Sequence, residues 1–206
     1  MTNTSPRSLL LRIAGPVVAA LILAACAAAP TRAPDTHYEL DASIPPVSFG
    51  VNGSVVLRRV DVRGLQSGRS LITIIGEEPM RFQEERGHFW HVATPTLIER
   101  AFLNAMNEAS ADAAFGTSES FASVDYRMAI TVTRFAYMPG GEAMVNFDAT
   151  VTEGGGDVVL ARSYWGRAPL AADTPAAGVT ALGAALGEAM TVFAAELADA
   201  IQVPVS

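Results

Sequence analysis

The chain has 206 residues, of which 50% are hydrophobic and 17% are charged. This length fits one domain with an ample core, and the low charge and abundant aliphatic residues exclude intrinsic disorder. The formal net charge is −7 and every basic residue is arginine, which excludes nucleic acid as the main partner because phosphate binding needs a basic surface. A single cysteine excludes a disulfide framework within one chain.

The first 25 residues are organised like an export signal. They contain no acidic residue, and Arg7 and Arg12 form a basic region before an apolar run from Ile13 to Ala25. As a helix that run would be about 20 Å long, which is too short for a hydrocarbon core of about 30 Å. A basic start, a short apolar stretch and small residues before a break predict a signal peptide over residues 1–25.

The end of this segment predicts lipidation. It reads Leu23-Ala24-Ala25-Cys26 and uses the only cysteine of the chain. The segment resembles the bacterial lipobox, which implies cleavage before Cys26, thioether lipidation of its sulfur and acylation of the new amino group by a fatty acid such as palmitate. Several acyl chains give stable anchoring, at about 0.8 kcal/mol per buried CH₂, where one chain is marginal. The alternative is an ordinary signal peptide in which Cys26 is merely a small hydrophobic residue.

Residues 26–36 are predicted to be the lipidated cysteine and a flexible tether. They show no apolar periodicity after Cys26 and contain two prolines, so they predict an extended spacer that reaches about 3.1 Å per residue. In enterobacteria an aspartate directly after the cysteine retains a lipoprotein in the inner membrane. Ala27 stands there instead, and by that analogy we expect the outer membrane, with the chain facing the periplasm.

Residues 37–206 are predicted to form a single domain that begins with strands. His37–Leu40 reads as a short first strand. Ser54–Val62 is typical of a strand that places Val56, Val60 and Val62 on one face and Arg59, Asp61 and Arg63 on the other.

A hairpin is predicted next. The unbroken aliphatic and β-branched run Leu71–Ile75 predicts a buried strand. A turn at Gly76-Glu77-Glu78-Pro79 then allows Met80–Gln83 to pair back.

The first predicted helix begins near Thr94. Thr94 is a favourable N-cap and Pro95 suits the first helical position. Apolar residues recur at helical spacing on one face: Leu97, Ile98, Ala101, Phe102, Ala105 and Ala109. Residues 110–123 are rich in Ala, Ser and Gly and are predicted to be a loop.

Three strands with strict alternation follow. Apolar residues occupy every second position in 126–132 and 143–151, and a third strand is expected over Val158–Trp165. Glycine-rich turns at 138–141 and 154–157 connect these segments. Short turns between period-two segments predict an antiparallel meander with one buried face.

A long helix is predicted from about Pro175 to Ile201. Its apolar stripe consists of Val179, Leu182, Leu186, Met190, Phe193, Leu197 and Ile201. The interior glycines weaken a helix, and we expect them to let it lie close against a sheet. Although Gly183 and Gly187 have the spacing of a membrane dimer motif, Glu188, Glu196 and Asp199 argue against a membrane span. The order of strands, helix, meander and helix predicts an α+β fold: a largely antiparallel sheet with two helices packed on one face.

Candidate catalytic and metal-binding residues are few. His88 and His91 are the only close histidine pair, but the zinc-protease pattern is absent, so hydrogen bonding at a strand end is the favoured interpretation. The pairs Glu77-Glu78 and Glu84-Glu85 could act as acid and base, but both flank a predicted turn, where carboxylates are usually just solvated. With Cys26 committed to lipid, thiol catalysis has no candidate. We therefore expect no enzyme activity, no cofactor and no metal.

Two aromatic residues before the first helix allow two interpretations. Trp90 either packs against that helix, or Phe89 and Trp90 form part of an apolar surface that contacts a partner. The sequence alone leaves this choice open.

Several motifs together resemble the ABC-type transport auxiliary lipoprotein family. They are Tyr38-Glu39-Leu40 soon after the lipidated cysteine, the valine-rich strand Val55–Val62, the segment Gly68–Ile75, and Trp90 before an amphipathic helix, followed by the meander and an Ala-rich helix. The family commonly shows an aromatic pair where His37-Tyr38 stands, and an acidic-Pro-Leu stretch where this chain reads His91-Val92-Ala93-Thr94-Pro95.

The resemblance implies a non-catalytic outer-membrane component of an intermembrane lipid transport system. Its implied partners are MCE-domain proteins, which work with an inner-membrane permease and ATPase, and further copies of the chain in a ring. A pilot lipoprotein that assembles an outer-membrane barrel or secretin is the main alternative. A direct lipid carrier is a third, disfavoured because two helices on a sheet leave no obvious large cavity.

Overall fold

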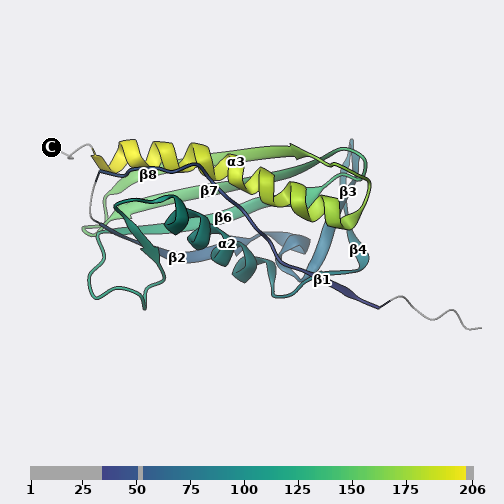
Figure 1. Cartoon of the computed structure of the whole chain (residues 1–206), viewed down its shortest axis with the longest axis horizontal. Helices are drawn as coiled ribbons and strands as arrows, with labels where there is room; N and C mark the ends of the chain where they lie inside the picture. The colour runs from purple at the N-terminus through teal and green to yellow at the C-terminus, as the bar shows by residue number, and fades with distance from the viewer. Residues whose placement is uncertain (1–33, 51–52, 203–206) are drawn as a thin grey trace, which may run out of the picture. The chain divides into compact units, whose positions relative to one another are not determined.

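The computed structural model describes residues 34–50 and 53–202 of the chain (Figure 1). The predicted signal peptide, Cys26 and most of the predicted tether lie outside the described residues. The elements in chain order are β1 (Thr36–Tyr38), β2 (Ser54–Val62), the 3₁₀ helix η1 (Gly64–Ser67), β3 (Ser70–Glu77), β4 (Met80–Trp90), α2 (Thr94–Ala109), β5 (Ala114–Gly116), β6 (Tyr126–Tyr137), β7 (Glu142–Glu153), β8 (Val158–Pro169) and α3 (Pro175–Gln202).

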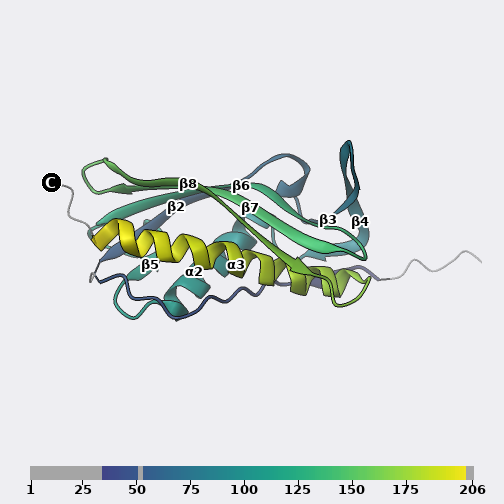
Figure 2. The ribbon, with the colours of Figure 1, turned by 90° about the horizontal axis from the view of Figure 1, so that it is seen from above.

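The sheet is organised around β6. One edge of β6 pairs antiparallel with β7, which pairs antiparallel with β8. The other edge pairs in parallel first with β2 and then, at Tyr137, with β3. Farther from β6, β2 pairs with β5. On the other branch β3 pairs with β4, and β4 pairs with β1. The predicted α+β fold is therefore confirmed, with a mixed, mostly antiparallel sheet and both helices on one of its sides (Figures 1 and 2).

The predicted meander is confirmed and each of its strands is longer than expected. The alternate residues Met128, Ile130 and Val132 of β6 are buried in the core, as are Val145 and Phe147 of β7. A backbone hydrogen bond from Gly156 to the carbonyl of Glu153 closes the glycine-rich turn before β8. Period-two patterning thus places one face of all three strands against the helices.

The two helices and the meander share an aromatic cluster. Phe102 of α2 lies 5.6 Å from Phe193 of α3, and Phe147 of β7 lies 6.1 Å from Phe193 between ring centroids. Tyr164 of β8 completes the cluster at 5.3 Å from Phe193. Such tilted and edge-on pairs each add about 0.5–1.5 kcal/mol beyond the burial of their area.

The side chains of β2 do not follow the predicted faces. Val55, Leu57 and Val60 all lie in the main core, because a register shift between Leu57 and Arg59 inserts an extra residue. A β-bulge of this kind reverses the alternation partway along a strand. The prediction that Val56 shares a face with Val60 was therefore wrong.

The hairpin of β3 and β4 is confirmed but is longer than predicted. Leu71 enters the main core, whereas Ile72 and Ile74 form a second cluster with Ala136 and Met144. This second cluster is separate from the main core because alternate residues of a strand point to opposite faces. Ile75 is exposed, so the expectation of an entirely buried run holds only for its first four residues.

A buried amide fills the gap where β2 ends and β3 begins along β6. The backbone N–H of Phe135 has no strand partner there and instead donates to the side-chain oxygen of Gln66 in η1. Gln66 is itself buried. This bond matters because an unsatisfied buried donor costs about 1–3 kcal/mol.

Helix α2 spans the predicted residues, but its N-terminus differs from the prediction. Ala93 is the N-cap and makes no side-chain capping bond. The hydroxyl of Thr94 instead donates to the carbonyl of Gly68 at 2.7 Å, and the Thr94 N–H donates to the same oxygen at 3.0 Å. Thr94 therefore ties the start of α2 to the loop before β3.

Close backbone approaches explain three glycines. A methyl group added at Gly166 of β8 would lie 2.0 Å from the carbonyl oxygen of Ala185 in α3. At Gly183 and Gly187 it would instead meet the carbonyls of Asp41 at 2.0 Å and Ser43 at 2.5 Å. Gly166 thus brings β8 close to α3, and Gly178 of α3, where a methyl group would lie 2.8 Å from the ring of Tyr137 in β6, meets the sheet as expected. Gly183 and Gly187 instead receive the segment that follows β1.

By length and composition α3 could cross a membrane, but 56% of its most apolar window is buried within this domain. It is therefore the central core helix of the fold.

The predicted loop 110–123 contains the short strand β5, which pairs with the start of β2 and was not predicted.

Candidate functional site

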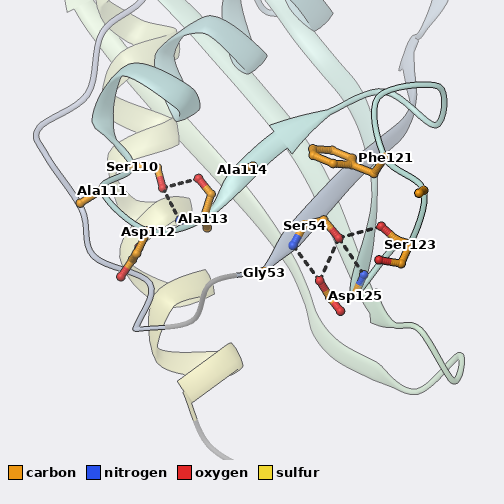
Figure 3. A pocket seen from close by; sticks show the side chains of 11 residues that line it. Gly53, Ser54, Ser110, Ala111, Asp112, Ala113, Ala114, Phe121, Ser123 and Asp125 are labelled. Carbon is orange, nitrogen blue, oxygen red and sulfur yellow. Dashed lines mark hydrogen bonds between the residues drawn. The ribbon is translucent and has the colours of Figure 1, made fainter.

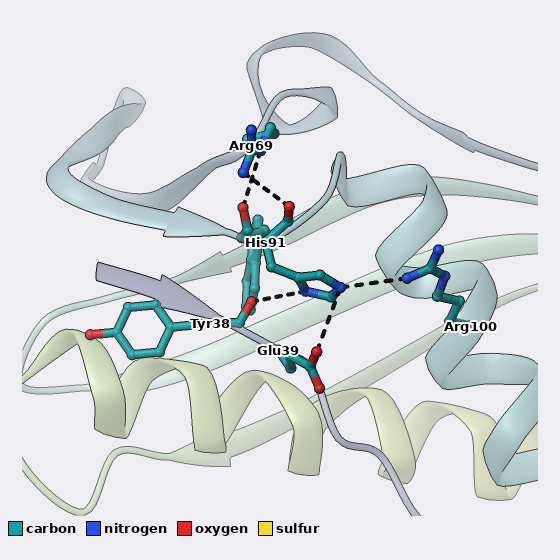
Figure 4. Close-up of polar contacts among 6 residues, drawn as sticks. Tyr38, Glu39, Arg69, His91 and Arg100 are labelled. Atoms are coloured by element: carbon teal, nitrogen blue, oxygen red, sulfur yellow. Dashed lines mark hydrogen bonds and ion pairs between the residues drawn. The ribbon is translucent and has the colours of Figure 1, made fainter. Parts of the chain in front are cut away.

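The first described strand joins the rest of the domain in an area that we call the N-terminal junction (Figure 4). It joins the end of β1 to the end of β4 and the start of α2. Its members are Tyr38, Glu39, Arg69, Trp90, His91 and Arg100.

Strand β1 is the first described element and pairs in parallel with the end of β4. Tyr38 lies opposite Trp90 in register, and the N–H of His91 donates to the carbonyl of Tyr38 at 3.0 Å. The Tyr38 hydroxyl also lies 3.0 Å from Nδ1 of His88, with the two rings stacked. The predicted first strand is thus confirmed, beginning one residue earlier and ending two residues earlier than expected.

Arg69 holds the turn between β4 and α2. Its guanidinium donates to the carbonyl of Trp90 at 3.2 Å and to the carbonyl of His91 at 2.9 Å. In return the N–H of Trp90 donates to the carbonyl of Arg69 at 2.6 Å. These bonds fix the direction in which the chain leaves the sheet to begin α2.

His91 connects three parts of the junction. Its Nδ1 lies 3.3 Å from the carbonyl of Tyr38, so this nitrogen carries the proton because a carbonyl oxygen only accepts. In the neutral ring Nε2 is then an acceptor for Arg100, at 3.5 Å. The carboxylate of Glu39 lies 3.6 Å from the same nitrogen.

The two histidines therefore have separate partners: the Tyr38 hydroxyl for His88, and the Tyr38 carbonyl, Glu39 and Arg100 for His91. Within residues 34–50 and 53–202, no three His, Cys, Asp or Glu residues lie close enough to hold a metal ion. The observed contacts match the interpretation that these histidines make hydrogen bonds at a strand end.

Phe89 and Trp90 lie in different environments. Trp90 is 1% exposed and packs against Phe135, with ring centroids 5.6 Å apart. A side chain buried to this extent offers no surface to a partner in this conformation, so it belongs to the core. Phe89 is partly buried beside His37, at 5.9 Å between ring centroids.

A second site, a polar hollow of about 580 Å³, lies at the start of β2, beside the loops that follow α2 (Figure 3). Asp125 accepts from the N–H and the hydroxyl of Ser54, both at 2.8 Å. Asp112 accepts from the Ser48 hydroxyl at 2.7 Å and from the N–H of Phe49 at 2.8 Å. Sequence reasoning missed both carboxylates, since each bonds to residues more than sixty positions away.

These bonds set the charge of the hollow. Hydrogen bonds from Ser48 and then from Phe49 lower the pKa of Asp112 below its usual value. The N–H and hydroxyl of Ser54 likewise lower the pKa of Asp125. Both groups are therefore ionised at neutral pH and accept hydrogen bonds rather than donate a proton. Asp125 fastens its loop to the start of β2, and Asp112 joins its loop to the segment Ser48–Gly50.

Two tyrosines of the core are held neutral. Burial is the main cause that raises the pKa of Tyr137 and of Tyr164. The Tyr164 hydroxyl donates to Glu196 at 2.8 Å, which favours its neutral form further. The fold and these sites define an α+β domain whose polar groups position backbone segments, above all the first described strand, β1.

The chain belongs to the family described as ABC-type transport auxiliary lipoprotein component, which matches residues 38–194. That match covers more than half of the chain and confirms the resemblance found in the sequence. Membership implies a lipid anchor in a membrane and association with an ABC transport system. No curated protein matches the chain.

Two solved structures share the fold. A protein from Xanthomonas campestris is 19% identical with a TM-score of 0.68, and the match covers 81% of this chain and 97% of that one. A crystal structure of an uncharacterized protein is 12% identical with a TM-score of 0.63, and the match covers 82% and 98% of the two chains. At these identities the likeness shows the fold alone.

The family motifs meet at the N-terminal junction. Tyr38, Arg69 and Trp90 come from three separate motifs of the sequence, yet they are joined there by backbone and side-chain hydrogen bonds. Pairing with β4 holds the first strand of the domain against its body, and the Arg69 guanidinium holds the turn that follows Trp90.

Proposed function

We propose that this chain is a non-catalytic lipoprotein of an intermembrane lipid transport system, anchored through Cys26 to the outer membrane. The family match is the observation that carries the proposal. The lipobox-like segment before Cys26 supports the anchor, and the N-terminal junction supports a role in which the anchored end is firmly attached to the folded body.

The tether sets how far the domain extends from the membrane. Residues 27–35 separate Cys26 from the first residue of β1. At about 3.1 Å per residue this segment spans about 28 Å when extended. With its acidic net charge, the domain would be repelled by anionic lipid surfaces, so the tether and its lipid hold it near the membrane.

The partner we propose is an MCE-domain protein whose assembly reaches across the periplasm. The domain, alone or as a ring of identical copies, docks the distal end of that assembly so that lipid passes without crossing free water. Phe89, partly buried beside the N-terminal junction, is a proposed contact for this partner. Energy is supplied by the ATPase of the system.

The anchor is tested with Cys26→Ala in the full chain, with Ala28→Ser as the matched control. We expect labelled palmitate to enter the wild-type and control chains only, and the Cys26→Ala chain to leave the lipidated membrane fraction. Ala27→Asp is expected to move the protein from the outer to the inner membrane. Equal labelling of all variants would contradict the proposal.

The partner is tested by crosslinking intact cell envelopes and identifying what co-purifies with the chain. We expect an MCE-domain protein. Recovery of an outer-membrane barrel or secretin in its place would favour the pilot-lipoprotein alternative and contradict the transport role.

A further inference from the structure

The meander ends in a long edge strand. β8 has 12 residues and pairs with β7 along its length. Among residues 34–50 and 53–202, no strand pairs with the other edge of β8. An unpaired edge of this length presents backbone donors and acceptors to any extended chain that meets it.

The direction of the backbone groups on β8 follows from one side-chain contact. The N–H of Arg167 donates to the carboxylate of Glu188 at 2.6 Å, so it points away from β7. Pairing with β7 is regular from Leu160 to Pro169. The N–H groups of Ser163 and Trp165 therefore point the same way, and no described residue accepts a hydrogen bond from either.

This edge lacks the usual protection over its middle part. Natural edge strands are blocked by bulges, prolines or covering elements. In β8 the register shift falls between Val158 and Leu160, and Pro169 ends the strand. Glu188 covers the N–H of Arg167, which leaves Leu160–Trp165 open to pairing.

The two sides of this open edge differ in character. On the side of α3, a groove of about 530 Å³ is lined by Leu160, Arg162, Glu196 and Asp199, among others. Arg162 pairs with Glu196 at 2.8 Å. On this side the carboxylates of Glu188, Glu196 and Asp199 in α3 therefore outnumber the one guanidinium of Arg162. Figure 2 looks down on α3 and β8.

On the opposite face of the sheet, Trp165 is 66% exposed. It lies opposite Asn146 of β7 in register and lines a shallow pocket with Met144 and Arg134. An exposed tryptophan beside a free strand edge is a ready apolar contact for an alternate side chain of an added strand.

We propose that the Leu160–Trp165 edge of β8 binds an extended segment of a partner polypeptide as an added strand, with basic side chains toward α3 and apolar side chains toward Trp165. Backbone hydrogen bonds supply affinity and the alternate side chains supply specificity. This goes beyond the proposed function, because it depends neither on the lipid anchor nor on the identity of the transport system.

Charge disfavours a two-fold contact in which this edge pairs with the same edge of a second copy. In a two-fold contact each copy presents the same surface. Glu188, Glu196 and Asp199 of one copy would then face the same acidic side of the other. Like charges brought together across an interface are unfavourable, whereas lysine or arginine side chains would complement this side.

The test uses the purified full chain in detergent and a synthetic peptide of about nine residues, a typical strand length. The peptide alternates valine and lysine. Only two tryptophans occur in the chain, and Trp90 is buried, so a blue shift of emission on binding reports Trp165. We expect saturable binding with such a shift, and protection of the Ser163 and Trp165 amides from hydrogen exchange.

Four comparisons test strand addition and charge complementarity. A peptide with alternate N-methyl groups, which cannot pair along an edge, should bind at least about tenfold more weakly, and a valine–glutamate peptide should lose affinity to a similar extent. Ser163→Pro removes an edge-facing N–H and should abolish binding. It also removes the hydroxyl that donates to Asp148 of β7; Ser163→Ala loses the same hydroxyl but keeps the N–H, so it is the matched control and should retain binding. Trp165→Ala should weaken binding, as measured by protection of the Ser163 amide, whereas Leu65→Ala, at an exposed apolar residue of η1, should not.

Three results would overturn the proposal: no binding of the valine–lysine peptide, equal binding of its N-methylated form, or unchanged binding by a folded Ser163→Pro chain. A self-association that Ser163→Pro abolishes would also overturn it, because a second copy would then occupy this edge. Palmitate labelling of Cys26 is read separately, so failure here is distinguishable from failure of the proposed anchor.

Discussion

Replacing Gly183 by alanine would add a methyl group where α3 meets the segment after β1. The added carbon would lie 2.0 Å from the carbonyl oxygen of Asp41, a backbone atom. The helix cannot yield easily at this position, since its other side is packed in the core. We therefore expect the segment around Asp41 to move off α3.

The expected magnitude follows from two opposing effects. Alanine is favoured over glycine in a helix interior by about 1 kcal/mol. Movement of the segment exposes Leu40 and Ala42, which are buried, at a cost of about 2 kcal/mol for the leucine and about 1 kcal/mol for the alanine. The free energy of unfolding should fall by about 2 kcal/mol, and Tm by about 6 °C for a chain of this size.

Thermal unfolding followed by circular dichroism measures this change, with Ala184→Gly as the matched control. Ala184 is the exposed neighbour of Gly183, and its substitution reports helix propensity alone, with a loss of about 1 kcal/mol. Propensity by itself would make Gly183→Ala more stable than the wild type. A rise in Tm for Gly183→Ala would therefore refute the close packing of this segment on α3.

Three further predictions concern single side chains. Gln66→Leu leaves the Phe135 N–H without an acceptor and should cost about 1–3 kcal/mol in urea unfolding; a cost as small as that of the exposed control Gln83→Leu would contradict this. Trp90→Ala should cost about 3–5 kcal/mol by the same measurement, and a near-neutral result would disprove its core role. Because hydrogen bonds from Ser54 lower the pKa of Asp125 in the folded state, the carboxylate contributes stability above its unfolded pKa, and this stability is lost as pH falls through the folded pKa. Asp125→Asn should thus be less stable than the wild type at neutral pH, with the difference shrinking below about pH 4; a difference that does not depend on pH would contradict the assignment.

The meander and both helices could be predicted because their signals are local. Strict alternation over long strands fixes which face is buried, and glycine-rich turns fix how the strands are joined. In α3 the apolar stripe from Leu182 to Ile201 is continuous, so its period is unambiguous. These elements need no knowledge of distant residues.

Elements whose form depends on distant partners could not be predicted. Valine and arginine make up six of the nine residues of β2, so its bulge after Leu57 leaves no trace in the pattern. Thr94 has the residue type of an N-cap, but its hydroxyl donates a hydrogen bond to the carbonyl of Gly68 instead. The N-terminal junction is similar, because Arg69 binds carbonyl groups, which carry no sequence signal.

The central claim is that this domain is held at a membrane through Cys26. Mass spectrometry of the mature protein purified from its native membranes tests it most directly. The account predicts an N-terminal peptide that begins at Cys26 and carries the mass of a thioether-linked diacylglycerol, with a further acyl group on its amine. A mature chain that begins elsewhere, or a Cys26 sulfur without lipid, would contradict it.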